Sequence, residues 1–277
     1  MPVVSTFCKK GGVGKSTFIG FLGHYYATQG KKVLIISADD QNSIFKIFGA
    51  DDKIFERQDD FFEYLLAGKA DLGDVLIDVR ENLYLIKTLN TDKLSTKLTL
   101  ERSQEKMIRK IIDEYASWFD YIFIDFPPSS NRLSEVLLDL SDAIMVVVGL
   151  DSLGLDGFFN TIQYFYDSDI DVGHIKYIIP NSFSKNRRAP KVSLNKLTAQ
   201  AADFTKQAVV LPPIYDRAIV KNLQAEGISV FDKVELERYD QKQLNLLKGE
   251  LLELFKLIDL NKKDPEPKNN LASKLGK

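Results

Sequence analysis

The stretch "CKKGGVGKST", residues 8–17, decides which fold this 277-residue sequence can adopt. A short apolar run at 2–7 precedes it, and a helical pattern of apolar residues follows it as far as Gly30. The three glycines of the stretch let backbone N–H groups turn inward and approach a polyphosphate closely. A strand, a glycine-rich loop and a helix in this order predict a phosphate-binding loop.

The side chains at the end of the stretch are those that a bound polyphosphate needs. Lys15 would neutralise the β- and γ-phosphates, the Ser16 hydroxyl would ligate Mg²⁺, and Thr17 would hydrogen-bond the α-phosphate. The positive N-terminal end of the following helix adds to the same field. Lys9 stands where the Walker pattern has its first glycine, and Lys10 is a further lysine that the pattern does not need. We expect Lys9 to be a solvated surface lysine.

The same alternation of strand and helix continues along the chain. Amphipathic segments separate the apolar runs, and this βαβ order implies a parallel sheet with right-handed crossovers. We predict one doubly wound α/β domain over residues 1–260, with a mostly parallel sheet between helices, and a polar, flexible tail over 261–277. The predicted strands are 2–7, 31–37, 82–89, 121–129, 142–150, 175–183 and 208–214.

Composition narrows the class of protein. The net charge of −2 gives no global basic field, so an anionic partner has to meet a local patch. Cys8 is the single cysteine, which excludes a disulfide framework or a cysteine-rich metal site within one chain and fits a reducing cytoplasm. No apolar segment approaches the roughly 20 residues of a membrane span, and no signal-peptide pattern opens the chain.

A carboxylate ends another predicted strand, in "FDYIFIDFPPSSN", residues 119–131. Four apolar residues precede Asp125, which is the Walker B arrangement, and Pro127 and Pro128 stiffen the exit of the strand. The carboxyl ends of parallel strands meet at one edge of a sheet, beside the phosphate loop. We therefore expect Asp125 to hold Mg²⁺ through water, since this ion keeps much of its hydration shell.

The segment "KGGVGKST", residues 10–17, resembles the deviant Walker A motif of the ParA/MinD family of P-loop ATPases, and the resemblance runs from Pro2 to Leu257. It implies an ATPase that uses ATP and Mg²⁺ and forms a homodimer when ATP is bound. It also implies that Lys10 reaches across the dimer interface to the partner's nucleotide, where it stabilises the charge that develops during hydrolysis. The nucleotide-binding residues of this loop are Lys10, Gly11, Gly12, Val13, Gly14, Lys15, Ser16 and Thr17.

The segment "SADDQNS", residues 37–43, is similar to the family's switch segment, Asp-x-Asp-Pro-Gln. Asp39 matches the second aspartate, which in the family orients or activates the attacking water and which here would also meet the metal through water. Ser37 replaces the first aspartate and Asp40 replaces the proline. Asp40 is the alternative to Asp39, and the motif alignment favours Asp39. Because of these two departures, a non-hydrolysing, ATP-dependent adaptor is an alternative function for this protein.

Two further stretches resemble the family's adenine pocket. In "IIPNSF", Asn181 ends a strand that faces the adenine in relatives, and in "LPPIYDR", Pro212 and Pro213 match part of the base pocket. The resemblance therefore implies that these three residues contact the base. The alternative is that they are ordinary turn residues.

A local positive patch is the predicted DNA-binding surface. The stretch 182–200 is basic and has no acidic residue, and a second basic pair lies in a segment similar to the DNA-binding region of ParA proteins. Such groups give salt-dependent, sequence-independent binding to phosphates. The alternative is a solvated charged surface. The candidate residues are Lys185, Arg187, Arg188, Lys191, Lys196, Arg217 and Lys221.

The resemblance is to the short ParA type, because the first strand begins at residue 2 and no DNA-recognition segment precedes it. It implies segregation of a plasmid or chromosome region on the nucleoid in the cytoplasm, with a centromere-binding adaptor that stimulates hydrolysis. The alternative is a MinD-like ATPase that binds a membrane or cell pole. The end of the chain, "DPEPKNNLASKLGK", has no broad apolar face, so membrane binding is the weaker expectation.

Overall fold

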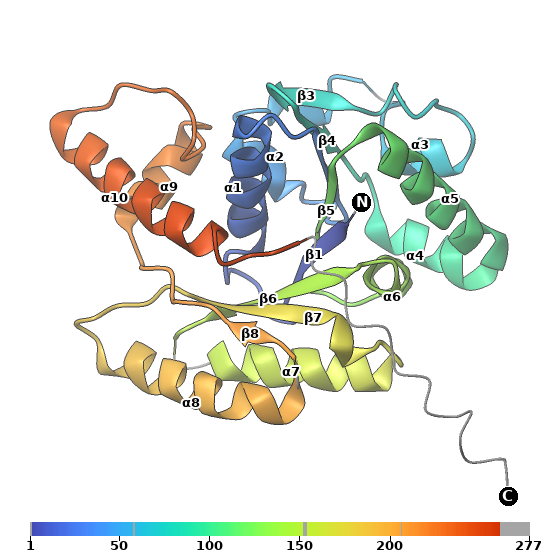
Figure 1. The fold of residues 1–277 in the computed structure, drawn as a ribbon. Helices are drawn as coiled ribbons and strands as arrows, with labels where there is room; N and C mark the ends of the chain where they lie inside the picture. The colour runs from blue at the N-terminus through green and yellow to red at the C-terminus, as the bar shows by residue number, and fades with distance from the viewer. Residues whose placement is uncertain (1, 58, 152–153, 206, 261–277) are drawn as a thin grey trace, which may run out of the picture.

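The structure is a computed structural model that describes residues 2–57, 59–151, 154–205 and 207–260 (Figure 1). The tail predicted over 261–277 lies outside the described residues.

The described residues form one eight-stranded sheet. All neighbouring strands in it run parallel except β3 and β4, which are antiparallel at one edge. The expected doubly wound, mostly parallel fold is thus confirmed. The strand order is β3 (Ile77–Arg80), β4 (Leu83–Ile86), β2 (Val33–Ser37), β5 (Tyr121–Asp125), β1 (Val3–Phe7), β6 (Ala143–Gly149), β7 (Ile175–Asn181) and β8 (Val209–Val210).

Helices cover both faces of the sheet, and each face has its own apolar core. On one face lie α1 (Lys15–Thr28), α2 (Ser43–Ile47), α9 (Ala218–Ala225) and α10 (Arg238–Phe255). The other face carries α3 (Phe62–Leu66), α4 (Thr91–Leu100), α5 (Arg102–Trp118), α6 (Arg132–Asp139), α7 (Gly154–Asp167) and α8 (Arg188–Phe204). Short 3₁₀ turns lie at Asp52–Ile54 and Val172–His174.

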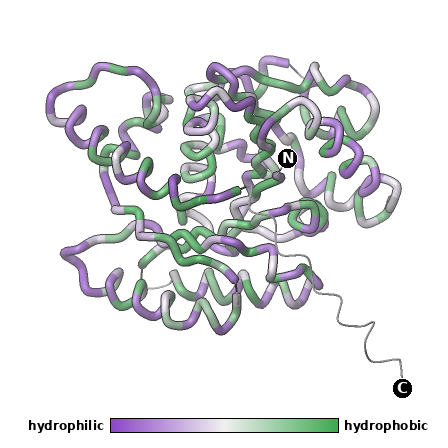
Figure 2. The backbone as a smooth tube through the Cα atoms, in the orientation of Figure 1, coloured by the Kyte–Doolittle hydropathy of each residue, from purple (hydrophilic) through white to green (hydrophobic). Residues whose placement is uncertain are grey.

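The central strands are apolar because both of their faces are covered. Every residue of β1, β2, β5 and β6 is buried, and Figure 2 shows hydrophobic residues along the strands and hydrophilic ones on the outer turns of the helices. The parallel register pairs Asp125 of β5 with Thr6 of β1 and with Ser37 of β2. The carboxyl ends of these strands and the phosphate loop therefore meet at one edge.

Several elements were not predicted from the pattern, among them α2, the two 3₁₀ turns, β3 and α4. The antiparallel edge strand β3 is only four residues long, and α4 is rich in threonine, a weak helix former. α4 begins where the side chain of Asn90 accepts a hydrogen bond of 2.8 Å from the backbone N–H of Lys93. The cap and burial of Leu94 and Leu98, rather than intrinsic propensity, account for this helix.

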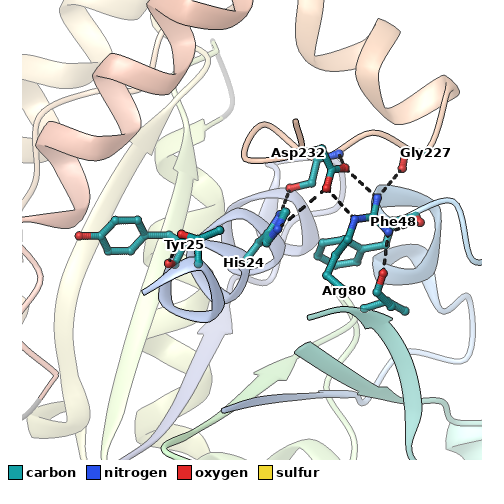
Figure 3. A network of polar contacts seen from close by, with 9 residues as sticks. His24, Tyr25, Phe48, Arg80, Gly227 and Asp232 are labelled. Carbon is teal, nitrogen blue, oxygen red and sulfur yellow. Dashed lines mark hydrogen bonds and ion pairs between the residues drawn. The ribbon is translucent and has the colours of Figure 1, made fainter. Parts of the chain in front are cut away.

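A polar network joins four segments that are far apart in the sequence (Figure 3). The guanidinium group of Arg80 donates to both carboxylate oxygens of Asp232, at 2.6 and 2.7 Å, and also to the carbonyl oxygens of Phe48 and Gly227, both at 3.1 Å. His24 of α1 bonds Ser229 through Nδ1 at 2.7 Å, and its Nε2 lies 3.9 Å from Asp232. The network ties α1, the end of α2, β3 and the α9–α10 connection together.

The segments of this network approach so closely that a side chain would not fit between them. Gly227 has φ +64°, and a Cβ there would lie 2.3 Å from the Cα of Gly49. Burial lowers the pKa of His24 to about 4, because the low-dielectric surroundings disfavour the charged ring and Asp232 offsets this only in part. His24 is therefore neutral and buried at neutral pH.

The pH dependence of stability tests this burial. Between pH 6.5 and 4 the unfolded chain binds a proton at His24 that the folded chain does not, so stability falls as pH falls, by about 3 kcal/mol from this group. The free energy of unfolding, measured with urea from pH 7 to pH 4, should fall less steeply in His24→Gln than in the wild type. Equal slopes in the two proteins would contradict this assignment.

Candidate functional site

The phosphate loop joins β1 to α1 through two glycines in the left-handed region, Gly12 with φ +70° and Gly14 with φ +94°. A Cβ at Gly14 would lie 2.4 Å from the side-chain nitrogen of Asn181, so only glycine fits. Gly14 is also the N-cap of α1 and gives it no side-chain cap. The first N–H groups of α1 are thus left for an anion.

Lys15 is held inside this loop by the loop's own backbone. Its side chain is buried, and its Nζ donates to the carbonyl oxygens of Lys10 at 3.2 Å and Cys8 at 3.4 Å. Burial lowers the pKa of Lys15, while Cys8, Asp125 and Asp39 act in the opposite direction. The ammonium group is therefore placed at the bottom of the loop, where a nucleotide phosphate would meet it.

Asp125 is fully buried at the end of β5, and neither of its carboxylate oxygens has a hydrogen-bond partner of ordinary geometry. Burial raises the pKa of Asp125 to about 7, and the neighbouring Ser16 hydroxyl and Lys15 ammonium lower it only in part. Buried carboxylates are normally paired, so two unsatisfied oxygens beside Ser16 fit a hard cation such as Mg²⁺. The described residues contain no cluster of three His, Cys, Asp or Glu ligands.

Asp39 and Asp40 are adjacent in sequence but face different surroundings. Asp39 lines the cavity of about 470 Å³ in front of the phosphate loop, and its Oδ1 accepts from the backbone N–H of Gln41 at 3.0 Å. Burial raises the pKa of Asp39. Asp40 is exposed and accepts instead from the hydroxyl of Thr91 at 3.1 Å. The geometry places Asp39, not Asp40, in the cavity. Ser37, which replaces an acid, donates to the carbonyl oxygen of Asp39 at 2.9 Å.

A second cavity, of about 190 Å³, adjoins the loop on the side of β7 and α9. Asn181 lies in its wall and donates to the carbonyl oxygen of Val13 at 2.7 Å, so its amide supports the loop. Pro212 and Pro213 do not line this cavity, whereas the segment 214–217 does. Gln224 of α9 lines both cavities and donates to the hydroxyl of Thr17 at 2.7 Å. No sequence motif marks Gln224.

Lys10 points away from the cavity in front of its own loop and is not among the described residues that line it. Its Nζ pairs with both carboxylate oxygens of Asp151, at 2.7 and 2.8 Å, just beyond the end of β6. α7 packs closely here, since a Cβ at Gly157 would lie 2.8 Å from the Cβ of Lys10. Asp151 and Gly157 were not identified from the sequence, because their only signal is this long-range contact.

Lys9 was expected to be a solvated lysine, and this is wrong. It is half-buried, its backbone N–H donates to the hydroxyl of Thr161 at 3.0 Å, and its Nζ donates to the hydroxyl of Ser130. The same ammonium lies 4.9 Å from the centre of the Tyr164 ring. Lys9 therefore braces the phosphate loop against α7 and the exit of β5.

The predicted DNA-binding residues do not all share one environment. Lys185 and Arg217 approach the same ring, that of Tyr215, at 5.1 and 5.8 Å. Arg217 is already paired with Glu250 of α10, which offsets its charge. Lys221 is exposed on α9, on the other face of the sheet from α8. The basic residues exposed on α8 and on the loop before it are Lys185, Arg187, Arg188, Lys191 and Lys196.

Within the described part of the chain, no helix has the length and apolar character needed to cross a membrane.

The chain is similar to known proteins in sequence. A family model described as an AAA domain matches residues 1–172. The chromosome-partitioning ATPase Soj of Treponema pallidum is 31% identical over 157 residues, which are 56% of this chain and 60% of that protein. The match thus spans less than two thirds of the Treponema protein. Maintenance of carboxysome distribution protein A of Synechococcus elongatus is 25% identical over 234 residues, 83% of this chain and 92% of that protein.

A solved structure has the same fold. It is a plasmid partition protein from Borrelia burgdorferi B31 bound to AMPPNP, which is similar with a TM-score of 0.72 over 93% of this chain and 99% of that chain. Its sequence identity to this chain is 21%, so the likeness shows the shared fold alone.

The bond from Asn181 to the phosphate loop predicts a particular binding defect. Asn181→Ala should weaken the binding of ATP and of inorganic tripolyphosphate by the same factor. The expected loss of affinity is about fivefold, because one net hydrogen bond contributes about 1 kcal/mol. Isothermal titration calorimetry of both ligands against the wild type and the variant measures this. A loss confined to ATP would show that Asn181 acts on the base and not on the loop.

Proposed function

Because this chain belongs to the AAA domain family and is a P-loop ATPase of the ParA/MinD type, we propose that ATP closes two copies of it into a sandwich dimer that binds DNA without sequence preference. The dimer would segregate a plasmid or chromosome region on the nucleoid, with a centromere-binding adaptor that stimulates hydrolysis. The observation that carries this proposal is the position of Lys10, which Asp151 holds outside the cavity of its own chain.

The reaction that this chain shares with its family is the hydrolysis of ATP to ADP and phosphate, which uses Mg²⁺. Mg²⁺ supplies charge neutralisation at the phosphates when it is bound. In the proposed mechanism, the phosphate loop and Lys15 would bind the phosphates, and Ser16 and Asp125 would hold the ion, Asp125 through water. Asp39 lies in the same cavity and would orient the attacking water. The unsatisfied, buried oxygens of Asp125 support this arrangement.

Lys10 would supply a positive charge at the γ-phosphate that the site of a single chain lacks. Charge grows on the γ-phosphoryl oxygens as the bond breaks, and a cation placed there lowers the barrier. In the single chain, the ammonium group of Lys10 is instead bound by an exposed carboxylate. We infer that the partner's bound nucleotide competes with Asp151 for this lysine, so that ATP favours the dimer by contacts that the monomer does not have.

Binding to DNA is supported by the exposed basic residues of α8 and of the loop before it. A chromosome-partitioning ATPase is among the proteins with similar sequences, which supports such a role. Positioning of a cellular cargo other than DNA is the second candidate function. The Synechococcus relative is named for carboxysome distribution, and the match covers 92% of its length. MinD-like membrane binding and a non-hydrolysing adaptor are weaker candidates, since neither requires the exposed basic residues of α8.

Binding of a random-sequence DNA duplex tests the proposal most simply. Affinity should be high with ATP, low with ADP or no nucleotide, and should fall steeply as salt rises. Lys191→Glu on α8 should weaken binding, whereas Lys31→Glu, an exposed lysine before β2, should not. DNA binding that is the same with ATP, with ADP and without nucleotide would reject the partition mechanism, and so would the absence of DNA binding in all three states.

Mixing two inactive variants tests the position of Lys10. Lys10→Ala lacks the lysine, and Asp39→Ala lacks the carboxylate that orients water. If Lys10 acts on the partner's nucleotide, a mixed dimer has one complete site, and an equal mixture should recover roughly a quarter of the wild-type hydrolysis rate. If Lys10 acts within its own chain, the mixture stays as inactive as either variant alone.

A further inference from the structure

A groove of about 230 Å³ lies between α3 and α4 on the face of the sheet opposite α1. Its floor is apolar and is formed by Leu66, Leu89 and Leu94. Leu89, in the turn between β4 and α4, is 45% exposed. The groove therefore offers an apolar surface that the described residues do not cover.

The rim of the groove is positively charged. Lys69, Lys93 and Lys97 line it, and none of the three forms an ion pair with a described residue. Lys69 lies 5.8 Å over the ring of Tyr64. The single carboxylate of the lining, Glu63, accepts from the backbone N–H groups of Leu89, at 2.9 and 3.1 Å, and Asn90, at 2.6 Å. The carboxylate of Glu63 is thus bound by backbone N–H groups, and Lys69 and Lys93 are exposed while Lys97 is half-buried.

We propose that the groove between α3 and α4 binds an acidic, amphipathic segment of a partner protein. Apolar side chains of that segment would cover Leu66, Leu89 and Leu94, and its carboxylates would pair with the lysines of the rim. A nucleic acid fits less well, because an apolar floor offers nothing to a phosphate backbone. The binding does not depend on the proposed function, whereas the effect on hydrolysis described next rests on it.

The groove is joined directly to the switch segment of the nucleotide site. Thr91, at the start of α4, donates to Asp40, and the backbone carbonyl of Thr88 accepts from the amide of Asn42 at 2.7 Å. On the far side of α4, Ser95 accepts from the backbone N–H of Arg132 at 2.9 Å, at the start of α6 after the exit of β5. A partner that orders α4 would therefore also order the segment that carries Asp39. This gives Asp40 a role outside the cavity.

The probe for the groove is a synthetic helical peptide with Leu at i, i+4 and i+7 and Glu at the flanking positions, labelled for fluorescence anisotropy. The full chain with ATP should bind it, and Lys93→Glu/Lys97→Glu should weaken binding by about tenfold or more. Lys106→Glu/Lys110→Glu, an exposed pair of the same spacing on α5, is the matched control and should bind as the wild type does. A peptide with Lys in place of Glu should bind the Lys93→Glu/Lys97→Glu protein best.

The proposal is overturned if the wild-type protein does not bind the Glu peptide, or if the two charge-reversed proteins bind that peptide equally well. It is also overturned if Lys93→Glu/Lys97→Glu loses binding to DNA but keeps binding to the peptide. The link to the switch segment has its own test. The peptide should change the hydrolysis rate of the wild type but not of Thr91→Val, which still binds the peptide. Peptide binding with DNA binding absent would reject the partition function and keep the groove.

Discussion

The structure depends on one buried carboxylate. Asp125 lies at the end of a fully buried strand, and both of its oxygens are without hydrogen-bond partners among the described residues. A buried charge without a partner is costly, and burial raises the pKa of Asp125 to about 7. The parallel register places this group beside the phosphate loop, where Lys15 and Ser16 are its neighbours. These buried oxygens are the feature that fits a bound cation at this edge of the sheet.

A second cation separates this site from an ordinary phosphate loop. Lys15 is held by the loop's carbonyl oxygens, and Lys10, five residues earlier, is held outside by Asp151. Two lysines of one short loop thus have different partners: Lys15 bonds the loop's own carbonyl oxygens and Lys10 pairs with Asp151. A site whose reactive end is completed by a neighbouring copy couples nucleotide binding to assembly.

Much of the fold and the loop could be predicted because their signals are local. Buried parallel strands appear as apolar runs, and Gly12, Gly14 and Lys15 follow a fixed spacing. Asp151, Gln224 and the pair of Arg80 with Asp232 could not be found, because each acts through a contact with a distant segment. Lys9 was misjudged for the same reason: the hydroxyl that it bonds belongs to Ser130. Asp39 was separated from Asp40 by motif alignment, and the cavity lining agrees.

The central claim is that the site becomes complete only between two copies of the chain. The most direct measurement is the molar mass of the hydrolysis-deficient Asp39→Ala protein by light scattering during gel filtration, with Mg²⁺ and either ATP or ADP. The account predicts a dimer with ATP and a monomer with ADP. A monomer in both nucleotides, together with full ATP turnover by the wild-type protein at the same concentration, would contradict it.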